Sequence, residues 1–350
     1  MKYHLALRKI KRRQGERGSA LIAVLCLIFL GGMLAASVAS LSMLNTVDVA
    51  SHVNLQRSFY INEGVMNRVQ FFIAADRYVN GTKPLMGDID YTEYEYDRFL
   101  PDGVIHEVDY YGTLVRVRVY DAISGWDFAG NVYRSTLDGF IADIDTEQNT
   151  IDLVENLKVR IADYIDTDDN VTTTRSARAS SVDSMEKDEY ESGGLAPLPR
   201  NAALEYREEL FFIKDFTSLF PPDVRGRLSS IRLIPPPSTV TLNGTPSFFS
   251  ATPDMLMQKA DLEEDELAQV LEARDKLRRE RIQISDILDS TLLSRLQSNM
   301  SWRASDYYTV IVDAPPGSGR PSYRLCASFG AFSVDGAQDE TQEYLEWIFY

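Results

Sequence analysis

An unbroken apolar segment near the N-terminus is the first feature of the hydrophobic pattern. No residue from Ser19 to Val47 carries a charge, and the next charged side chain is Asp48. A helix needs about 20 apolar residues to cross a bilayer core, whereas a cleaved secretory signal has an apolar core of only about 7–15 residues. The length of this run therefore predicts a membrane-spanning helix that stays on the protein.

The same helix is predicted to continue beyond the membrane. No proline occurs before Pro84, so one helix is expected from Ser19 to about Arg77, with Gly64 as its weak point. Apolar residues in its second half recur at i, i+4, i+7 and i+8, which places them on one face that must pack against another surface. These residues are Val65, Val69, Phe72 and Ile73.

Period-two alternation marks strands in two distant parts of the chain. In "GTLVRVRVYDAISGWDF" (112–128), Val115, Val117 and Val119 alternate with polar or exposed positions, which predicts a half-buried strand. The preceding "HEVDYYG" is expected to pair with it as a hairpin. The stretch "DYYTVIVDAPPGSGRPSYRLCASFGAF" (306–332) predicts two strands about a Pro/Gly turn. The aromatic tail "DETQEYLEWIFY" is expected either to pack back on these strands or to form an exposed patch.

Helical patterns fill most of the chain between these strands. They are strongest in "TEQNTIDLVENLKVRIADYID" (146–166) and "DLEEDELAQVLEARDKLRRERIQISDILDSTLLSRLQ" (261–297). In the second, Leu267, Val270 and Leu271 share a face, and acids precede bases as the helix dipole favours. The pattern predicts an α+β fold, with a long N-terminal helix packed on a small antiparallel sheet and a large all-helical domain inserted into that sheet.

Charge and composition exclude several functional classes. The net charge is −16, which argues against nucleic acid as a partner because the phosphates would be repelled. Three histidines are too few and too scattered for a histidine metal site or a catalytic triad, and we find no P-loop, nucleophile-elbow or HExxH motif. No motif therefore points to a particular reaction, while the abundant acidic residues leave a catalytic carboxylate pair open, with no pair singled out. Bases dominate only the first 18 residues, which would hold the N-terminus in the cytoplasm: Lys2, Arg8, Lys9, Lys11, Arg12, Arg13 and Arg17 against Glu16.

The N-terminus resembles the type IV pilin and pseudopilin class. It has a short basic leader ending in a glycine, Gly18, followed by an uncharged helix with an amphipathic continuation. The resemblance implies cleavage by a prepilin peptidase between Gly18 and Ser19, N-methylation of Ser19, and retention of the helix. Most members carry glutamate at mature position 5, where this chain has Ala23. In the family that glutamate is thought to neutralise the amino terminus of the neighbouring subunit.

The alanine is informative about position in a fibre. A subunit at the very tip has no neighbour above it, so a carboxylate at Ala23 would lie unpartnered in lipid at a cost of several kcal/mol. The departure therefore favours a tip subunit over a stacking subunit. An ordinary signal anchor without a role in a filament is the alternative explanation of the segment.

Four segments follow one another in the remaining chain: "ADYIDTDD" (162–169), "SMEKDEY" (184–190), "LPRNAALEYREELFFIKDF" (198–216) and "STVTLNGTPSFFSATPDMLMQKADLEEDELAQVLEARDK" (238–276). Their order resembles the K-type minor pseudopilin of the type II secretion system, the GspK family. The departures are an insert at 171–183, Ser184 and Met185 where the family has Gly-Ala, and a turn lengthened by "GTPSFF".

Together, the pattern and the resemblance imply a division of the chain into five parts. We expect a removed leader at 1–18, the transmembrane and amphipathic helix at 19–78, the first part of the β domain at 79–148, the inserted helical domain at 149–300, and the last strands and tail at 301–350.

The resemblance also implies a calcium site in the helical domain, since members of the family bind calcium there. We carry it over to Asp166, Asp168 and Asp169, with Glu186 and Asp188 as ligands from a second segment. Calcium takes 6–8 oxygen ligands, and nearby carboxylates repel one another unless a cation or protons intervene. The alternative is a solvated acidic loop. The spacing does not match an EF-hand.

The function implied by the resemblance is structural, and it implies that the chain catalyses no reaction. The chain would be a minor pseudopilin at the tip of the secretion pseudopilus, anchored once in the inner membrane with a periplasmic head. It would cap or initiate the fibre with I- and J-type minor pseudopilins, the major pseudopilin and the inner-membrane platform. Two alternatives remain: a PilX-like minor pilin of a type IV pilus, and a membrane-anchored periplasmic enzyme or calcium-binding module.

Overall fold

The computed structural model divides the chain into two compact units by its contacts. The first comprises 1–60 with 316–322, and the second comprises 61–315 with 323–350. Side chains are not described for 2–19, 79, 80 and 278. The backbone is described for 2–80, 99–143, 145–172, 178–179, 183–194, 199–223, 226–234, 244–280, 282–315, 321–330 and 344–350.

The N-terminal helix α1 runs without a break from Lys2 to Asn80. It confirms the continuous helix predicted from the sequence and passes through Gly64. By length and composition, one part of it, within Ala20–Tyr78, is apolar enough to cross a membrane, with a mean hydropathy of 2.6 over the best window and none of that window buried. The apolar side chains of the segment, such as Leu27 and Phe29, are about two-thirds exposed, as an anchor surrounded by lipid would be.

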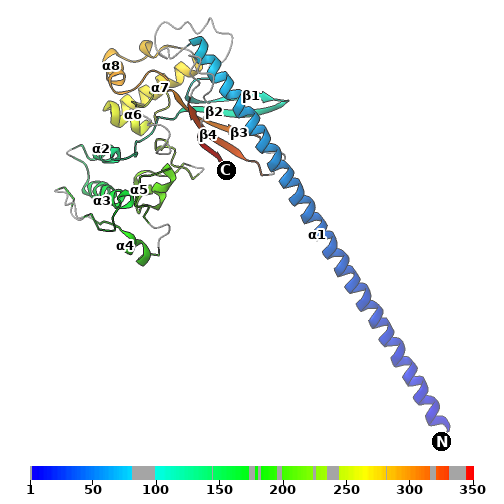
Figure 1. The fold of residues 1–350 in the computed structure, drawn as a ribbon. Helices are drawn as coiled ribbons and strands as arrows, with labels where there is room; N and C mark the ends of the chain where they lie inside the picture. Colours follow the sequence, from blue (N-terminus) through cyan, green and yellow to red (C-terminus); the bar gives the residue numbers. More distant parts are fainter. Residues whose placement is uncertain are drawn as a thin grey trace. The chain divides into compact units, whose positions relative to one another are not determined.

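The second unit is built on a five-stranded antiparallel sheet (Figure 1). Sequential neighbours pair throughout, in the order β1-β2-β3-β4-β5. The structure confirms the strands predicted at 112–128 and 306–332, and also the hairpin that the first of these was expected to form with the preceding segment. The tail forms a fifth strand, which the sequence did not predict. The strands are β1 (Asp102–Tyr110), β2 (Thr113–Asp121), β3 (Tyr307–Asp313), β4 (Arg324–Gly330) and β5 (Tyr344–Phe349).

A two-residue turn sets the register of the first hairpin. Tyr111 and Gly112 both have positive φ, 51° and 78°, which is the backbone of a type I′ turn and matches the twist of the flanking strands. Tyr110 therefore pairs with Thr113, and Val108 with Val115. This register places the three valines of β2 on one face of the sheet, where each is fully buried.

The second half of α1 packs on that face. Val65 and Val69 are fully buried and Ile73 is 2% exposed, which confirms the predicted stripe. Gly64 leaves room for the ring of Tyr110, because a Cβ at this position would collide with the hydroxyl end of that side chain and force it to move. The remaining core between helix and sheet consists of Met66, Val108, Val115, Val117, Val119, Tyr308, Val310, Val312, Ala314, Leu325, Ala327 and Phe329.

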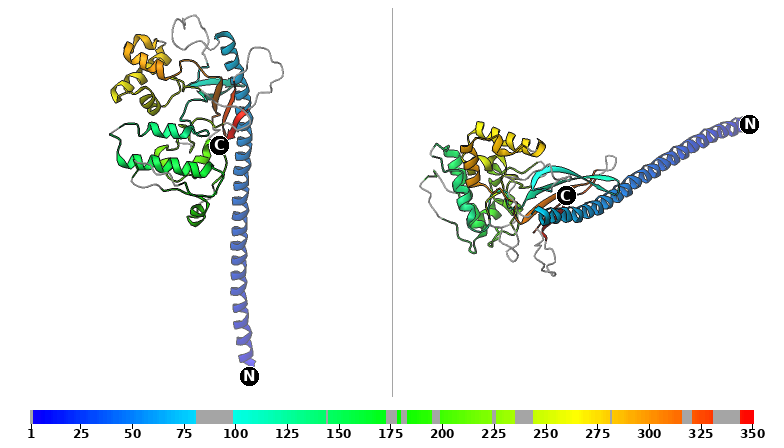
Figure 2. Two further views of the ribbon diagram at one scale, coloured as in Figure 1. Left: turned by 60° about the vertical axis from the view of Figure 1, so that its left-hand side comes forward. Right: turned by 90° about the horizontal axis from the view of Figure 1, so that it is seen from above.

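A helical region lies in the chain between β2 and β3, as predicted. Its helices form two groups, α2 to α5 and α6 to α8, which stay separate in the views of Figures 1 and 2. They share a hydrophobic core that includes Phe128, Phe216 and Leu256. The elements are α2 (Val132–Gly139), α3 (Gln148–Ile165), α4 (Lys187–Ser192), η2 (Arg207–Phe212), α5 (Phe216–Leu219), α6 (Pro253–Ala260), α7 (Glu264–Glu280), η3 (Ile284–Asp286) and α8 (Ser290–Asn299).

The second predicted helical stretch, 261–297, is divided in the structure. Helix α7 ends at Glu280 and α8 begins at Ser290. Asp289 starts the new helix because its carboxylate accepts hydrogen bonds from the backbone N–H groups of Thr291 and Leu292. Apolar residues continue at helical spacing between α7 and α8, so the sequence pattern alone did not show where the first helix ends. The predicted domain limits at 18, 78, 148 and 300 stay predictions.

Candidate functional site

The end of α3 carries the first carboxylates of the predicted metal site. Asp163 lies in the last turn and is fully buried, and Asp166 is the residue at which the helix ends. The two oxygens of Asp163 accept hydrogen bonds from the backbone N–H groups of Thr172 and Met185, at 3.0 Å each. Asp163 thereby fixes the two ends of the segment that separates α3 from α4.

Glu186 enters the same place from the start of α4. It is the N-cap residue of that helix and is 2% exposed. Its backbone N–H donates to the carboxylate of Glu189 at 3.0 Å, which fixes the backbone at this point. No hydrogen bond of ordinary geometry reaches either of its own carboxylate oxygens from the described residues, and the same is true of Oδ1 of Asp166. The backbone N–H groups of Lys187 and Glu189 face the Glu186 side chain at the start of α4.

These three carboxylates form one cluster. Ligand atoms of Asp163, Asp166 and Glu186 all lie within 4.8 Å of one another. No ion pair joins any of them to a basic side chain within the described parts of the chain. Burying carboxylates with neither hydrogen bonds nor a counter-charge is costly.

The electrostatics of the cluster follow from that arrangement. Burial, together with the charges of Asp163 and Asp166, raises the pKa of Glu186 to about 7. Burial also raises the pKa of Asp166, with the charges of Asp168 and Asp163 adding to the effect. The pKa of Asp163 is raised by burial in spite of the hydrogen bonds it accepts. Near neutral pH the site therefore favours a bound proton or a cation.

The structure brings together only some of the residues predicted for this site. Asp166 and Glu186 belong to the cluster, and Asp163 joins them. Asp168 and Asp169 are exposed just beyond the helix end, where Asn201 donates a hydrogen bond of 3.0 Å to the carboxylate of Asp169. Asp188 is exposed on α4. Ligation by these three is an untested prediction.

The donor set fits a hard cation. All three side chains offer oxygen, at least three oxygen atoms accept no hydrogen bond of ordinary geometry in the described structure, and calcium is bound through 6–8 oxygens. Carbonyl groups and water would supply the remaining ligands. A bound calcium ion would neutralise the repulsion in the cluster and tie the end of α3 to the start of α4.

The predicted processing residues all lie in α1. Gly18, Ser19 and Ala23 are within its helical backbone, and the side chain of Ala23 is exposed. The arrangement of the helix around Gly18–Ser19 does not test cleavage.

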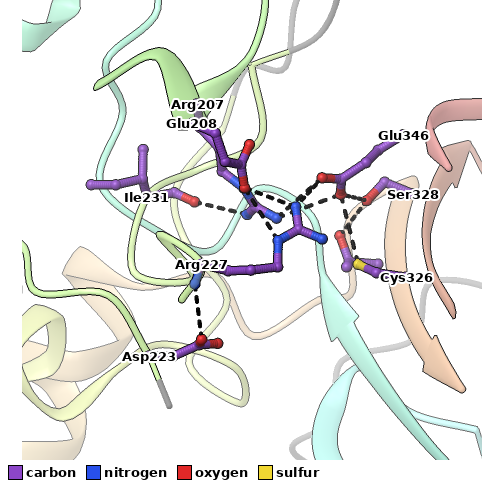
Figure 3. Close-up of polar contacts among 9 residues, drawn as sticks. Arg207, Glu208, Asp223, Arg227, Ile231, Cys326, Ser328 and Glu346 are labelled. Atoms are coloured by element: carbon purple, nitrogen blue, oxygen red, sulfur yellow. Dashed lines mark hydrogen bonds and ion pairs between the residues drawn. The ribbon is translucent and has the colours of Figure 1, made fainter. Parts of the chain in front are cut away.

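A second polar cluster joins the helical region to the sheet (Figure 3). Glu346 of β5 is 7% exposed in its side chain and forms ion pairs with Arg207, at 3.4 Å, and with Arg227. It also accepts a hydrogen bond of 3.1 Å from Ser328. Arg227 contacts Glu208 at 2.9 Å, so the two arginines and two glutamates form one network.

Burial would raise the pKa of Glu346, but the charges of Arg207 and Arg227 outweigh it and hold that pKa below its ordinary value. Arg207 further donates to the backbone carbonyl of Ile231 at 3.2 Å, which anchors it within the helical region. Sequence reasoning missed this network because its members are far apart in the chain and each is an ordinary charged residue. The network attaches the inserted helices to the last strand.

Comparisons with known proteins give likenesses to solved structures. No family model matches the chain, and no curated protein sequence matches it. Among solved structures, the chain is similar to a chain of the GspK–GspI–GspJ complex from the type 2 secretion system of enterotoxigenic Escherichia coli. The match covers 84% of this chain and 96% of that chain, with a TM-score of 0.47 and 10% sequence identity.

Proposed function

We propose that this protein is a K-type minor pseudopilin that stands at the tip of a type II secretion pseudopilus. The observation that carries the proposal is the dual use of α1. Its apolar side chains from Leu21 to Val49 are exposed, and its second half buries a stripe on an antiparallel sheet. A subunit that is stored in a membrane and then moved into a fibre needs a helix of this kind, continuous with its head.

The inserted helices and Ala23 support the tip position. The helical region adds bulk to a small sheet, and such bulk above the sheet would block the addition of another subunit. Ala23 lacks the carboxylate that would neutralise a neighbour's amino terminus in a stacking subunit. In this proposal the chain is held in the inner membrane by α1, with its head in the periplasm, and catalyses no reaction.

The proposed partners bind through helix and head surfaces. They are I- and J-type minor pseudopilins at the tip, the major pseudopilin below them, the inner-membrane platform, and the prepilin peptidase that removes 1–18. The fibre would help to move folded proteins across the outer membrane.

The N-terminus of the mature protein tests the proposal most directly. Protein recovered from cells is expected to begin with N-methylated Ser19, and Gly18→Val should leave the leader in place. Intact-mass spectrometry measures both. Met1 at the start of the recovered wild-type protein would contradict the proposal and favour a signal-anchored binding module. Copurification with the other minor pseudopilins tests the tip: recovery in molar excess, as from a fibre shaft, would also contradict it.

We further propose that Asp163, Asp166 and Glu186 bind calcium. Full-length protein in detergent micelles should melt several degrees higher in calcium than in a chelator, because calcium offsets the repulsion among the three carboxylates. Glu186→Gln should abolish most of this increase, while Glu191→Gln, which removes a charge on the exposed surface of α4, should retain it. Tryptophan fluorescence follows the unfolding. Equal melting temperatures with and without calcium would contradict the calcium site and leave the N-terminal test unaffected.

A further inference from the structure

The helical region contains an open groove that neither the metal centre nor the sheet uses. It has a volume of 740 Å³ and lies between the end of α2, the end of α5 and helix α6. The side chains lining its apolar part are Trp126, Phe140, Leu219, Phe220, Met257 and Leu262.

An aromatic wall runs along this groove. The rings of Trp126 and Phe140 are 5.0 Å apart, and those of Phe140 and Phe220 are 5.3 Å apart in an edge-to-face arrangement. Trp126 and Phe220 are nearly fully buried, so they hold the half-buried Phe140 in place and offer little surface themselves. The surface open to an apolar side chain is therefore that of Phe140, together with the half-buried Leu219 and Met257 of the same lining.

The rim of the groove is acidic. Asp143, Asp254 and Asp261 all line it and are all exposed. None of the three forms an ion pair with a described basic residue. The basic side chain nearest to the aromatic wall is Lys259, whose amino group lies 5.7 Å from the centre of the Trp126 ring. The lining of the groove therefore carries three carboxylates and no basic side chain.

These acids do not form a second metal site. Within the described residues, the group of carboxylates close enough to share an ion is Asp163, Asp166 and Glu186, which lies elsewhere. The hydroxyl of Ser230 also lines the groove, and it is buried without a hydrogen-bond partner in the described structure. The groove thus offers an apolar surface, three separate negative charges and one free hydroxyl.

We infer that this groove binds a short segment of another protein in which an apolar side chain lies between basic side chains. The apolar side chain would pack on the aromatic wall, and the lysine or arginine side chains would pair with the carboxylates at the rim. Charge complementarity selects this occupant, because a second copy of this acidic chain or an acidic peptide would be repelled. The inference does not depend on a position in a secretion fibre.

Fluorescence anisotropy with full-length protein in detergent micelles tests the inference. The probe is a fluorescein-labelled peptide, Gly-Lys-Leu-Arg-Phe-Lys-Gly. It is compared with Gly-Glu-Leu-Glu-Phe-Glu-Gly, which reverses the charges, and with Gly-Lys-Ser-Arg-Ser-Lys-Gly, which removes the apolar side chains. Only the first peptide is expected to bind with a dissociation constant below about 1 mM. Equal binding of the second or third peptide, or failure of the first to bind, would overturn the inference.

A pair of double variants separates the groove from the overall negative charge. Asp254→Asn with Asp261→Asn should weaken binding of the first peptide about tenfold, since two rim charges are lost. Asparagine also tolerates the left-handed backbone of Asp261, whose φ is 50°. Asp265→Asn with Asp286→Asn removes the same charge at exposed positions outside the groove and should change affinity less than about twofold. Equal loss in both double variants would show nonspecific attraction and would refute a site in the groove.

Discussion

The two faces of the sheet are held in different ways. The face toward α1 is lined by valines that are fully buried, and its centre is apolar. The polar contacts of α1 lie around that centre, where Asn62 donates to the carbonyl of Tyr323 and Gln70 donates to the hydroxyl of Tyr344. The opposite face presents Arg118, Thr309 and Glu346, and it meets the helical region through the ion-pair network and around a cavity of 310 Å³. One set of strands thus supports a packed apolar layer on one side and a polar joint on the other.

The contact of the sheet with α1 and its contact with the helical region should therefore be sensitive to different substitutions. Apolar burial contributes roughly 25 cal/mol per Å² and does not depend on any single partner. A buried ion pair contributes little net free energy, but removing one partner leaves the other charge buried and unpaired, at a cost of about 3–5 kcal/mol. The apolar face should therefore be destabilised most by substitutions that introduce a polar or charged side chain. The polar face should be destabilised most by substitutions that remove one member of an ion pair.

The largest effect is expected on the apolar face. Val117→Asp places a charge in a fully buried position between α1 and the sheet and should destabilise the second unit by more than about 4 kcal/mol. Leu114→Asp is the matched control, because Leu114 lies on the same strand but is 59% exposed. Tryptophan fluorescence during thermal unfolding of the full-length protein should show loss of the transition for the first variant and little change for the second.

The second-largest loss of stability is expected from removing a charge on the polar face of the sheet. Glu346→Gln leaves Arg207 and Arg227 buried with Glu208 as the acid that they share, and should destabilise the protein by about 3 kcal/mol. Adding Arg227→Met removes the excess positive charge and should restore part of the loss. The melting temperatures of both variants measure this. If the double variant melted below the single variant, the two residues would not be coupled as described.

Acid titration should distinguish the ion-pair network around Glu346 from the carboxylate cluster of Asp163, Asp166 and Glu186. The pKa of Glu346 is lowered in the folded protein, so its stabilisation is present above its ordinary pKa near 4.5 and is lost as the pH falls below it. The pKa of Glu186 is raised to about 7, so in a chelator stability should fall as the pH rises from about 4.5 to 7. The melting temperature is therefore expected to peak near pH 4.5–5.

The two arms of that profile have separate controls. Glu346→Gln should flatten the acid arm, and Glu186→Gln should flatten the arm toward neutral pH. A profile in which Glu186→Gln leaves the neutral arm unchanged would contradict the buried, unpaired state of its carboxylate.

The smallest expected effect concerns the close contact at Gly64. Alanine favours a helix over glycine by about 1 kcal/mol, but its Cβ would collide with the Tyr110 ring. In a Tyr110→Ala background, Gly64→Ala should therefore stabilise the protein by about 1 kcal/mol, while in the wild type the gain should be smaller or reversed. Melting curves of the four proteins form a double-mutant cycle; additive effects would rule out the contact.

Much of this fold could be predicted because its signals are local. The alternation of Val115, Val117 and Val119 specified a strand and its buried face, and the stripe from Val65 to Ile73 specified the helix face that covers it. Strand β5 was missed because its consecutive aromatic and aliphatic residues do not alternate with polar ones. Its pairing with β4 is a property of the assembled sheet.

The candidate sites were predictable only in part. The sequence pointed to Asp166 and Glu186 because each lies beside further acids, and family resemblance joined the two segments. The position of Asp163 depends on the helical turn that brings its buried carboxylate beside Asp166, and on Met185, which donates to it from the second segment. The network around Glu346 combines residues from three separate segments, and nothing in their local sequence distinguishes them from surface charges.

The junction where the chain leaves and re-enters the sheet has one further consequence. Asp121 pairs with Tyr308, and Ala122 donates its N–H to the carbonyl of Tyr307 at 3.0 Å, so the helical region departs and returns at adjacent ladder positions. Closing a longer loop at such a point adds only about 0.6 kcal/mol for each doubling of its length. Insertions and deletions in the helical region between β2 and β3 should therefore be tolerated during evolution without a change in strand register. The helices are thus free to diversify.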